Sequence, residues 1–341
     1  MSTRLAIVGL GRLGYEHARN IHTRIAGAEL AAICSVRQEE LDRVTSEMQP
    51  DFVTQSFEEL LAWGKFDGLV IATSSEVHAE QICAAAGAGV KNVYTEKPLG
   101  MSMEELWRIK SAVDANQGML FQVGYNHRFD ADMVEAKRRL EDGFVGRPVF
   151  IRLVSRDKTH VEKFLLAFSP SSGGLVADVM THDYDTARWL LGAEAKRIFG
   201  LGDAYAFEKL KDVPDIDNAV ILMEFTDGTM VQIEASRNAA YGYHAPMEIF
   251  GTKGAIKVGD TPRRNRSAYL STEGVVEECA DSFFEYWEDT YQAELADFVD
   301  CIRTGRAPKV GLEDGVKAVE WAFAAAQAVR EKKVVEFRSA F

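Results

Sequence analysis

Hydrophobic and polar positions follow two different patterns along the 341-residue chain. Up to about Val123, short apolar runs typical of buried strands alternate with stretches whose apolar residues recur at helical spacing. The expected strands are Leu5–Val8, Glu29–Cys34, Leu69–Thr73, Val90–Thr95 and Met119–Val123, and the expected helices are Leu13–Ile25, Glu39–Met48, Val77–Ala88 and Met103–Val113. This alternation predicts a doubly wound parallel sheet with helices on both faces, a Rossmann-type α/β domain over residues 1–123.

From about Gly124 the rhythm changes and predicts an α+β domain over residues 124–341. The expected helices are Asp130–Leu140, Tyr184–Leu191, Glu285–Arg303 and Leu312–Lys332, and the expected strands are Pro148–Val154, Arg197–Gly200, Asn218–Phe225, Met230–Ala235, Met247–Phe250 and Ala255–Val258. Asp227-Gly228 and Lys253-Gly254 lie between neighbouring strands as turn signals, so we expect a large, mostly antiparallel open sheet. The two C-terminal helices could also pack back on the first domain.

A glycine pattern, G-x-G-x-x-G, occupies residues 9–14 directly after the first strand and opens the first helix. In that context Gly9 allows the tight turn, Gly11 lets the backbone approach a pyrophosphate, and Gly14 lets the helix pack closely on the strand. The pyrophosphate would rest on the helix N-terminus. The pattern therefore predicts a dinucleotide site, with a ligand-free glycine turn as the alternative.

The end of the second strand bears on the choice of nicotinamide cofactor. No carboxylate occupies Ser35, and Arg37 can supply positive charge, so a 2′-phosphate would not be repelled. This favours NADP modestly. NAD remains the alternative if Arg37 is only a solvated residue at the start of a helix.

Two segments carry candidate catalytic chemistry. Lys97 follows the fourth strand in Thr-Glu-Lys-Pro-Leu-Gly, at the carboxyl edge of the predicted sheet, where ligands bind in such folds. Asp178 and His182 are four residues apart and would share one face of a helix, so the carboxylate could orient an imidazole that moves a proton. Taken singly, Lys97 could be a turn residue, Asp178 an N-cap, and His182 structural.

Composition narrows the partners and the location. The formal net charge of −13 disfavours nucleic acid and anionic membrane surfaces. The start of the chain does not resemble a signal peptide and no apolar run could span a bilayer, so we expect a cytoplasmic protein. Four scattered cysteines suggest neither disulfides nor a zinc site, and we expect no metal.

Several motifs in order resemble one family over nearly the whole chain. The glycine fingerprint, Glu96-Lys97-Pro98, the segment 124–129, Gly173-Gly174 with Asp178 and His182, and Tyr241-Gly242-Tyr243 before 248–251 are similar to the glucose-fructose oxidoreductase, inositol dehydrogenase and rhizopine-catabolism (Gfo/Idh/MocA) family, nearest its inositol 2-dehydrogenase branch. The resemblance implies that Lys97 holds the reacting hydroxyl, His182 is the general base and Asp178 orients it. It also implies a homo-tetramer, or a dimer, built through the open faces of the second-domain sheets.

The candidate site residues form two sets. Cofactor-binding candidates are Gly9, Gly11, Arg12, Leu13, Gly14, Ser35, Arg37, Thr73, His78, Glu96, Lys97 and Asn126, with Asn126 near the nicotinamide. Substrate-binding candidates are Lys97, His127, His160, Asp178, His182, Tyr241 and Tyr243, and Tyr291 could reach the nicotinamide. His127 stands where some inositol dehydrogenases carry an arginine, Val179 where a threonine is sometimes found, and the segment 158–172 with His160 could reach over the pocket, so the particular polyol stays open.

Together these features predict an NAD(P)-dependent dehydrogenase. It would oxidise a secondary hydroxyl of a cyclic polyol such as inositol, or of a pyranose sugar, by hydride transfer to nicotinamide C4 while His182 takes the hydroxyl proton. One alternative is a non-catalytic dinucleotide sensor or scaffold, since fold does not fix function. Another is a relative that keeps its cofactor bound and recycles it, in a glycosidase or an internal redox cycle.

Overall fold

The computed structural model describes residues 2–159, 162–213, 215–260, 263–272 and 274–341. The chain packs as two compact units, Met1–Asn126 with Asp289–Val316, and His127–Glu288 with Lys317–Phe341. The ranges expected from the sequence were 1–123 and 124–341, each contiguous. In the packed units the boundary lies after Asn126 and the segment 289–316 belongs to the first unit.

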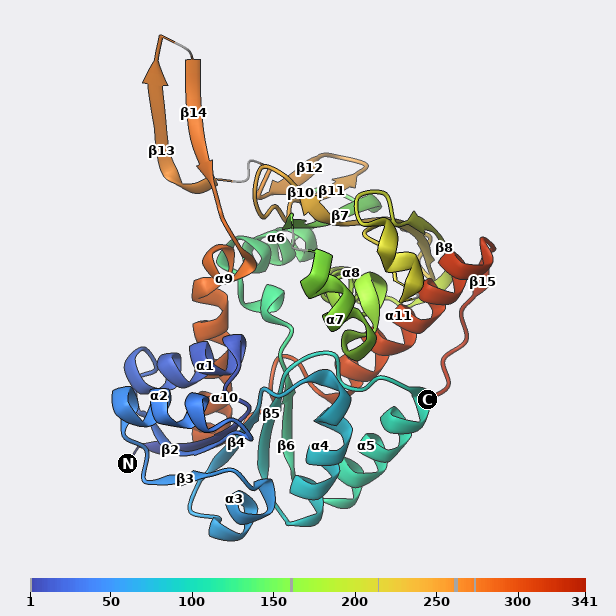
Figure 1. Ribbon diagram of the computed structural model, residues 1–341. Helices are drawn as coiled ribbons and strands as arrows, with labels where there is room; N and C mark the ends of the chain where they lie inside the picture. The colour runs from blue at the N-terminus through green and yellow to red at the C-terminus, as the bar shows by residue number, and fades with distance from the viewer. Residues whose placement is uncertain (1, 160–161, 214, 261–262, 273) are drawn as a thin grey trace. The chain divides into compact units, whose positions relative to one another are not determined.

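The first unit is a doubly wound parallel sheet, as expected (Figure 1). Its strands are β1 (Thr3–Val8), β2 (Ala28–Cys34), β3 (Phe52–Thr54), β4 (Gly68–Ile71), β5 (Asn92–Thr95) and β6 (Leu120–Val123), in the order β3-β2-β1-β4-β5-β6. Its helical segments are α1 (Arg12–Thr23), α2 (Gln38–Met48), α3 (Phe57–Trp63), η1 (Ser75–Val77), α4 (His78–Gly87), α5 (Met103–Ala115), η2 (Asn126–Phe129) and α10 (Glu288–Thr304), of which η2 and α10 begin or end at the unit boundary. The strand order reverses between β1 and β4, which makes their carboxyl ends the switch point of the sheet.

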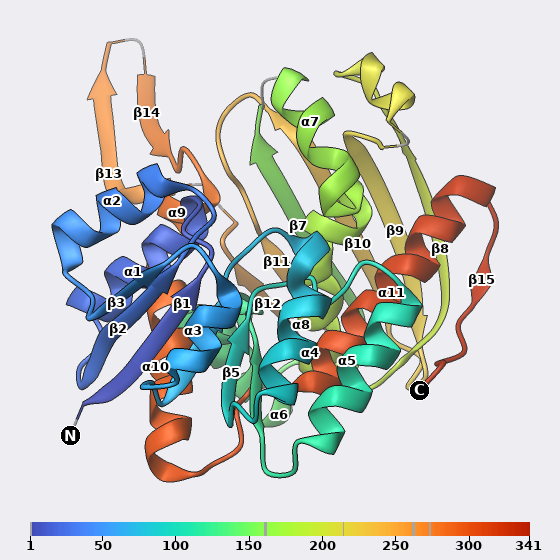
Figure 2. The same cartoon turned by 60° about the horizontal axis from the view of Figure 1, so that its bottom comes forward.

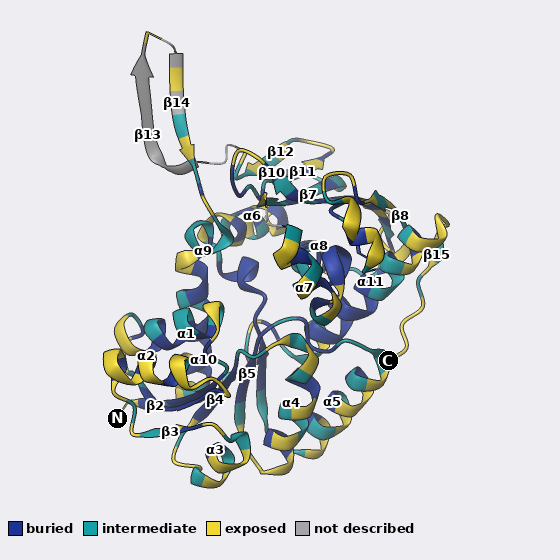
Figure 3. Cartoon of the chain, viewed as in Figure 1, coloured by how far each residue is buried: buried dark blue, intermediate teal, exposed yellow. Residues whose placement is uncertain are grey.

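The central strands of this sheet are buried on both faces because helices cover both (Figures 2 and 3). Helices α1, α2 and α10 contribute to one core, where Ile21, Val44 and Phe298 meet apolar side chains of β1 and β2. Helices α4 and α5 pack against each other over the other side. The strands consequently read as continuous apolar runs, the pattern that predicted them.

The second unit is built on a seven-stranded mixed sheet. Its strands are β7 (Pro148–Lys158), β8 (Ala195–Asp203), β9 (Asn218–Phe225), β10 (Met230–Ala239), β11 (Met247–Gly251), β12 (Ala255–Val258) and β15 (Val335–Glu336), in the order β12-β11-β7-β10-β9-β8-β15. Neighbouring strands are antiparallel except β7 and β10, which are parallel. A separate hairpin joins β13 (Arg263–Ser271) to β14 (Gly274–Cys279). The expectation of a large, mostly antiparallel sheet is confirmed.

The helical segments of this unit are α6 (Ala131–Glu141), α7 (Glu162–Ser172), η3 (Leu175–Val179), α8 (Thr181–Leu191), η4 (Glu208–Asp212), α9 (Phe283–Tyr286) and α11 (Leu312–Glu331), which begins in the first unit. Among them η3 packs on β9 and β10, and α8 on β7, so one face of the sheet is covered. Trp321 of α11 meets Phe225 of β9 edge-on at 5.4 Å between ring centroids. The opposite face is open, so β9 and β10 alternate between buried and partly exposed residues, the period-two pattern of a half-covered sheet.

Several short or irregular parts differ from the sequence-based expectation, among them β3, α3 and the segment 158–172. β3 and α3 were not predicted, because three-residue strands and seven-residue helices give little periodic signal. The segment 158–172, expected as a loop, contains α7 despite Pro170, while His160 lies outside the described residues. Among the described residues no single helix is long and apolar enough to cross a membrane, and one pair bent by 69°, α7 with 175–191, passes by length and composition only.

Candidate active site

The glycine fingerprint lies at the switch point of the first sheet. A Cβ on Gly9, whose φ is +87°, would come within 2.6 Å of the backbone at Ala72 and Thr73, just after β4. A Cβ on Gly14 would lie 2.0 Å from the carbonyl oxygen of Gly9, so helix and strand pack too closely for any side chain there. A Cβ on Gly11 meets nothing within 4 Å. Two glycines are thus required by the fold, whereas Gly11 leaves open space at the helix start, which fits an approaching pyrophosphate.

Ser35 and Arg37 lie at the carboxyl end of β2, as expected, but a carboxylate joins them. The Ser35 hydroxyl donates to Glu40 Oε2 at 2.6 Å, and Arg37 Nη1 lies 3.6 Å from Glu40 Oε1. The backbone N–H of Arg37 donates to the Ser35 hydroxyl at 3.2 Å. The edge of the sheet that would meet an adenosine ribose therefore carries a negative charge from α2.

Thr73, His78 and Asn126 support the same edge. The buried His78 ring lies between two carbonyl oxygens, 2.9 Å from that of Pro98 and 3.2 Å from that of Thr73, and burial lowers its pKa. It ties the loop after β4 to the loop after β5. The buried Asn126 amide nitrogen donates to Thr290 of α10 at 2.8 Å, which fixes the side chain.

Lys97 follows β5 and precedes a cis peptide bond to Pro98. The residue before it, Glu96, is buried and accepts from His17 Nε2 of α1 at 2.7 Å and from the Tyr94 hydroxyl at 2.9 Å. The Lys97 backbone N–H also lies 3.3 Å from Glu96 Oε2. Burial opposes the charge of Glu96, but the contacts with His17 and Tyr94 outweigh it and lower its pKa. The strand end that presents Lys97 is thus held by a buried carboxylate.

A second buried carboxylate, Glu294 of α10, lies against this cluster. Burial and the neighbouring Glu96 charge raise the pKa of Glu294 well above its usual range, which favours its neutral form. His17, Glu96 and Glu294 each offer a ligand atom within 4.8 Å of the others, which is the one arrangement that could hold a metal ion among the described residues. His17 and Glu96 are joined directly by their 2.7 Å hydrogen bond.

In the second unit Asp178 lies in a π-helical turn, η3, directly after Gly173-Gly174. Both glycines have positive φ, and a Cβ on Gly174 would lie 2.4 Å from Asp215 Oδ1. Asp215 accepts from the Leu175 backbone N–H at 2.9 Å and from Arg237 Nη1 at 2.5 Å. The buried Arg237 also places Nη2 3.8 Å from Asp178 Oδ2. The continuous helix expected to carry Asp178 and His182 is therefore a π turn followed by α8, which begins at Thr181.

His182, at the start of α8, belongs to a row of aromatic rings. Its ring stacks on His127 at 4.8 Å between centroids, and His127 lies 4.3 Å from the Trp287 ring. Trp287 Nε1 donates to the Tyr243 hydroxyl at 2.9 Å. His127, His182 and Tyr243 are thus joined through Trp287 in one row of rings.

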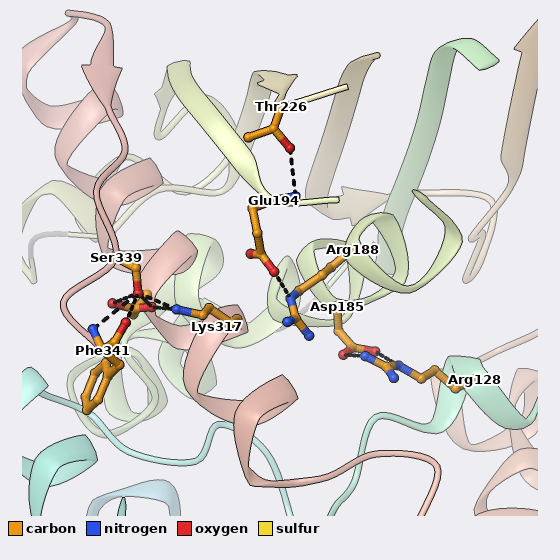
Figure 4. A network of polar contacts seen from close by, with 9 residues as sticks. Arg128, Asp185, Arg188, Glu194, Thr226, Lys317, Ser339 and Phe341 are labelled. Carbon is orange, nitrogen blue, oxygen red and sulfur yellow. Dashed lines mark hydrogen bonds and ion pairs between the residues drawn. The ribbon is translucent and has the colours of Figure 1, made fainter. Parts of the chain in front are cut away.

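Two buried polar contacts, one of them an ion pair, position α8 itself. Arg128 of η2 makes a two-pronged contact with Asp185, at 2.8 and 2.5 Å (Figure 4). One residue after His182, Asp183 accepts from the Ser155 hydroxyl of β7 at 2.9 Å, and burial raises its pKa to about 7. The helix start that carries His182 is therefore anchored both to η2 and to the sheet.

Tyr241 and Tyr291 lie apart from that row. The half-exposed Tyr241 hydroxyl accepts from Arg156 Nη1 at 3.0 Å, beside Glu234 on the open face of the sheet. Of the two tyrosines named as substrate candidates, Tyr243 is hydrogen-bonded to Trp287, whereas Tyr241 contacts Arg156. Tyr291 belongs to the first unit, with its ring edge-on to His17 at 5.9 Å.

A doubly wound sheet with a glycine fingerprint at its switch point defines the class: a dinucleotide-binding protein with the fold of oxidoreductases. Residues 3–125 match the oxidoreductase family, NAD-binding Rossmann fold, and residues 137–337 match the oxidoreductase family, C-terminal alpha/beta domain. The chain belongs to the Gfo/Idh/MocA oxidoreductase family, and the resemblance read from its motifs is confirmed.

Relatives within the family match over almost the full length. The chain is 33% identical to a scyllo-inositol 2-dehydrogenase (NAD(+)) of Bacillus subtilis, covering 98% of this chain and 96% of the relative. It is 32% identical to a myo-inositol 2-dehydrogenase of Thermotoga maritima, covering 98% of each. The crystal structure of a Lactobacillus casei scyllo-inositol dehydrogenase with bound NAD(H) and scyllo-inositol superposes with a TM-score of 0.94 at 32% identity, covering 98% of this chain and 99% of that one.

The sequence reasoning missed the residues that hold the motifs in place. Glu40, His17, Glu294, Asp215 and Arg237 were not singled out. His17 and Glu294 carried a signal, since an ionisable residue on the apolar stripe of a helix must find a buried partner. Arg237 carried a similar signal, because it falls on the buried side of the alternating pattern along β10.

Proposed function

We propose that this protein is an NAD-dependent dehydrogenase that oxidises a secondary hydroxyl of a cyclic polyol, with inositols as the first candidates and pyranose sugars as the second. The observation that carries the proposal is full-length similarity to inositol dehydrogenases. Lys97, Asp178 and His182 are the catalytic residues that we propose for it. The open space at Gly11 and the required Gly9 and Gly14 fit a bound dinucleotide.

The residues divide the work as follows. Bound nicotinamide supplies a hydride acceptor at C4. His182 takes the proton of the reacting hydroxyl, and Asp178 orients the imidazole and stabilises its cation. The Lys97 ammonium donates to the same hydroxyl oxygen and stabilises the negative charge that develops there. His127, which stacks on His182, and Tyr243, which is hydrogen-bonded to Trp287 in the same row of rings, contact other hydroxyls of the ring.

NAD is the cofactor that we propose, in place of the NADP favoured by the sequence alone. Glu40 engages both residues on which the NADP argument rested, the Ser35 hydroxyl and the Arg37 guanidinium. A carboxylate at the end of the second strand is the usual partner of an unphosphorylated ribose. The relative from Bacillus subtilis is named as an NAD(+) enzyme.

The test is a panel of inositol isomers and aldoses offered with NAD or NADP, followed by nicotinamide fluorescence. We expect reduction of NAD by at least one cyclic polyol, and a loss of turnover of about 10²–10⁴ in His182→Ala, the usual contribution of a general base. Lys97→Met keeps the chain length without the charge and should lose turnover while still binding NADH. The exposed His22→Ala and Lys65→Met serve as matched controls.

Two results would overturn the proposal. Cofactor binding without turnover on the whole panel would indicate a sensor or scaffold instead. Cofactor retained through purification, with no net reduction of added NAD, would indicate an internal redox cycle or glycosidase.

We also propose that a second copy of the chain covers the open face of the second sheet, toward a dimer or tetramer. Phe250, Phe150 and Met230 are cross-strand neighbours on β11, β7 and β10, and Phe250 and Met230 are each about half exposed. Leu201 and Leu222 extend this apolar surface over β8 and β9. Light scattering should give a dimer or larger, and Met230→Asp should shift it toward monomer while the equally exposed Trp107→Asp does not.

A reducing compartment such as the cytoplasm fits the cysteines. All four, Cys34, Cys83, Cys279 and Cys301, are free thiols, and two of them are buried. Fractionation of the native cells, with a soluble cytoplasmic marker, tests the compartment.

A further inference from the structure

Glu40 occupies an unexpected place for a carboxylate. It lies in the first turn of α2, five residues after the strand-end Ser35, and only 16% of its side chain is exposed. Its two oxygens reach different groups, Oε2 the Ser35 hydroxyl and Oε1 the side of the Arg37 guanidinium. The Arg37 backbone N–H closes the cluster on the Ser35 hydroxyl.

These contacts change what the strand end can offer a ligand. The Ser35 hydroxyl has one hydrogen to donate, and it is directed to Glu40. The Arg37 guanidinium is 68% exposed, so it can reach a ligand, but its charge is compensated by the carboxylate beside it. Arg43, one turn further along α2, is directed to the Leu10 carbonyl oxygen at 3.3 Å and lies over the Tyr15 ring.

We propose that Glu40 is the residue that sets cofactor choice in this chain, selecting NAD over NADP. The proposal rests on the proposed function, since it assumes that the fingerprint binds a nicotinamide dinucleotide. The free edge of the Glu40 carboxylate accepts a hydrogen bond from the 2′-hydroxyl of the adenosine ribose. A 2′-phosphate, which carries about −1.5 to −2 charges at neutral pH, is repelled by Glu40 and finds Arg37 already compensated.

A variant that removes the charge of Glu40 but keeps its shape tests whether this carboxylate selects NAD over NADP. Glu40→Gln can still accept from Ser35 but leaves Arg37 uncompensated, so NADPH should bind about 10- to 100-fold more tightly relative to NADH than it does to the original chain. The measurement is the dissociation constant of NADH and of NADPH, by protein fluorescence quenching or calorimetry, without substrate or turnover.

Two further variants make the result specific. Glu39→Gln removes a neighbouring, exposed charge in the same helical turn and should leave the NADPH-to-NADH ratio within about twofold, which separates a contact from the general field of the helix. Arg37→Ala should leave NADPH binding to the original chain within about twofold, yet abolish the gain in the Glu40→Gln background.

The outcomes separate this inference from the function on which it rests. If the original chain binds neither NADH nor NADPH, the proposed function fails. If it binds NADH and the ratio is unchanged in Glu40→Gln, the inference alone fails. A loss of NADPH affinity in Arg37→Ala alone would also overturn it, because Arg37 would then serve a 2′-phosphate despite Glu40, and this arm stands even if Glu40→Gln does not fold.

Discussion

The two segments that carry the candidate catalytic residues are held in place in contrasting ways. Lys97 follows a buried strand of a regular parallel sheet. Its neighbour Glu96 accepts hydrogen bonds from Tyr94 of β5 and His17 of α1, and these contacts favour its charged form. Asp178 lies in a π turn whose shape depends on Asp215 and on the buried Arg237 of β10. The first segment is positioned by the regular fold of its unit, and the second by one arginine from a distant strand.

This difference predicts where each segment is fragile. The β5 end has its backbone fixed by the sheet, so changes in its polar cluster should cost moderate stability. The π turn is not held by hydrogen bonds between strands. Its geometry depends instead on the buried charges of Asp215 and Arg237. Breaking a buried ion pair by removing one partner leaves the other charge uncompensated, which is among the most damaging single changes in a protein.

The largest effect is therefore expected for Arg237→Leu. It leaves Asp215 buried without its cation and takes the guanidinium away from Asp178, so the free energy of unfolding should fall by about 3–5 kcal/mol in urea. Arg138→Leu on α6 is the matched control, since its pairs with Glu135 and Asp142 are surface contacts worth about 0–1 kcal/mol. Equal losses in the two variants would contradict the contrast drawn here.

The buried Asp183 gives the second unit a pH signature. Its pKa is about 7 in the folded chain, above the ordinary value of 3.8 expected on unfolding. Between these two values the folded state binds more protons than the unfolded state, so stability is fully present below about pH 4 and falls as the pH rises toward 7. The loss attributable to this group is on the order of 4 kcal/mol.

Asp183→Asn should flatten that decline because an amide does not titrate there. Urea midpoints measured from pH 4.5 to pH 8 give the slope, and Asp132→Asn, an exposed acid on α6, is the control. An unchanged slope in Asp183→Asn would mean that this carboxyl is ionised throughout the range.

The same contrast explains what the sequence could predict. Residues 5–8 and 69–71 were predicted as strands because helices cover both faces of the first sheet and leave an uninterrupted apolar run. The glycine fingerprint was predicted because local backbone geometry requires glycine at positions 9 and 14. Strand β3 was missed because its three residues give no periodic signal.

In the second unit the identities of Asp178 and His182 could be predicted, but their geometry could not. A π turn differs from an α-helix through contacts to Asp215, 37 residues downstream of Asp178, and spacing within a segment carries no trace of them. Glu40 was missed for a similar reason. The sequence pattern points to Ser35, at the strand end, as the residue that meets the ribose. The carboxylate that reaches this place, Glu40, comes from the following helix.

The smallest effects separate two carboxyls of one cluster in the first unit. Glu96 accepts from His17 and Tyr94 and has a lowered pKa, whereas the pKa of the adjacent Glu294 is raised, so the charged form is favoured at Glu96 and the neutral form at Glu294. Glu96→Gln weakens charge-assisted bonds and should cost about 1–3 kcal/mol of unfolding free energy. Glu294→Gln replaces one neutral group by another and should cost less than about 1 kcal/mol.

The two variants control each other, because both residues are buried and the substitution is the same. The charged form of Glu96 stabilises the fold above the ordinary glutamate pKa of 4.5. This contribution is lost as the pH falls below that value, because the folded state then resists protonation. The deficit of Glu96→Gln relative to the original chain should therefore stay constant from pH 7 to about pH 5 and shrink as the pH falls below 4.5. If Glu294→Gln were instead the more damaging change at pH 7, the charge would reside on Glu294, and the Lys97 segment would be held by α10 rather than by its own strand.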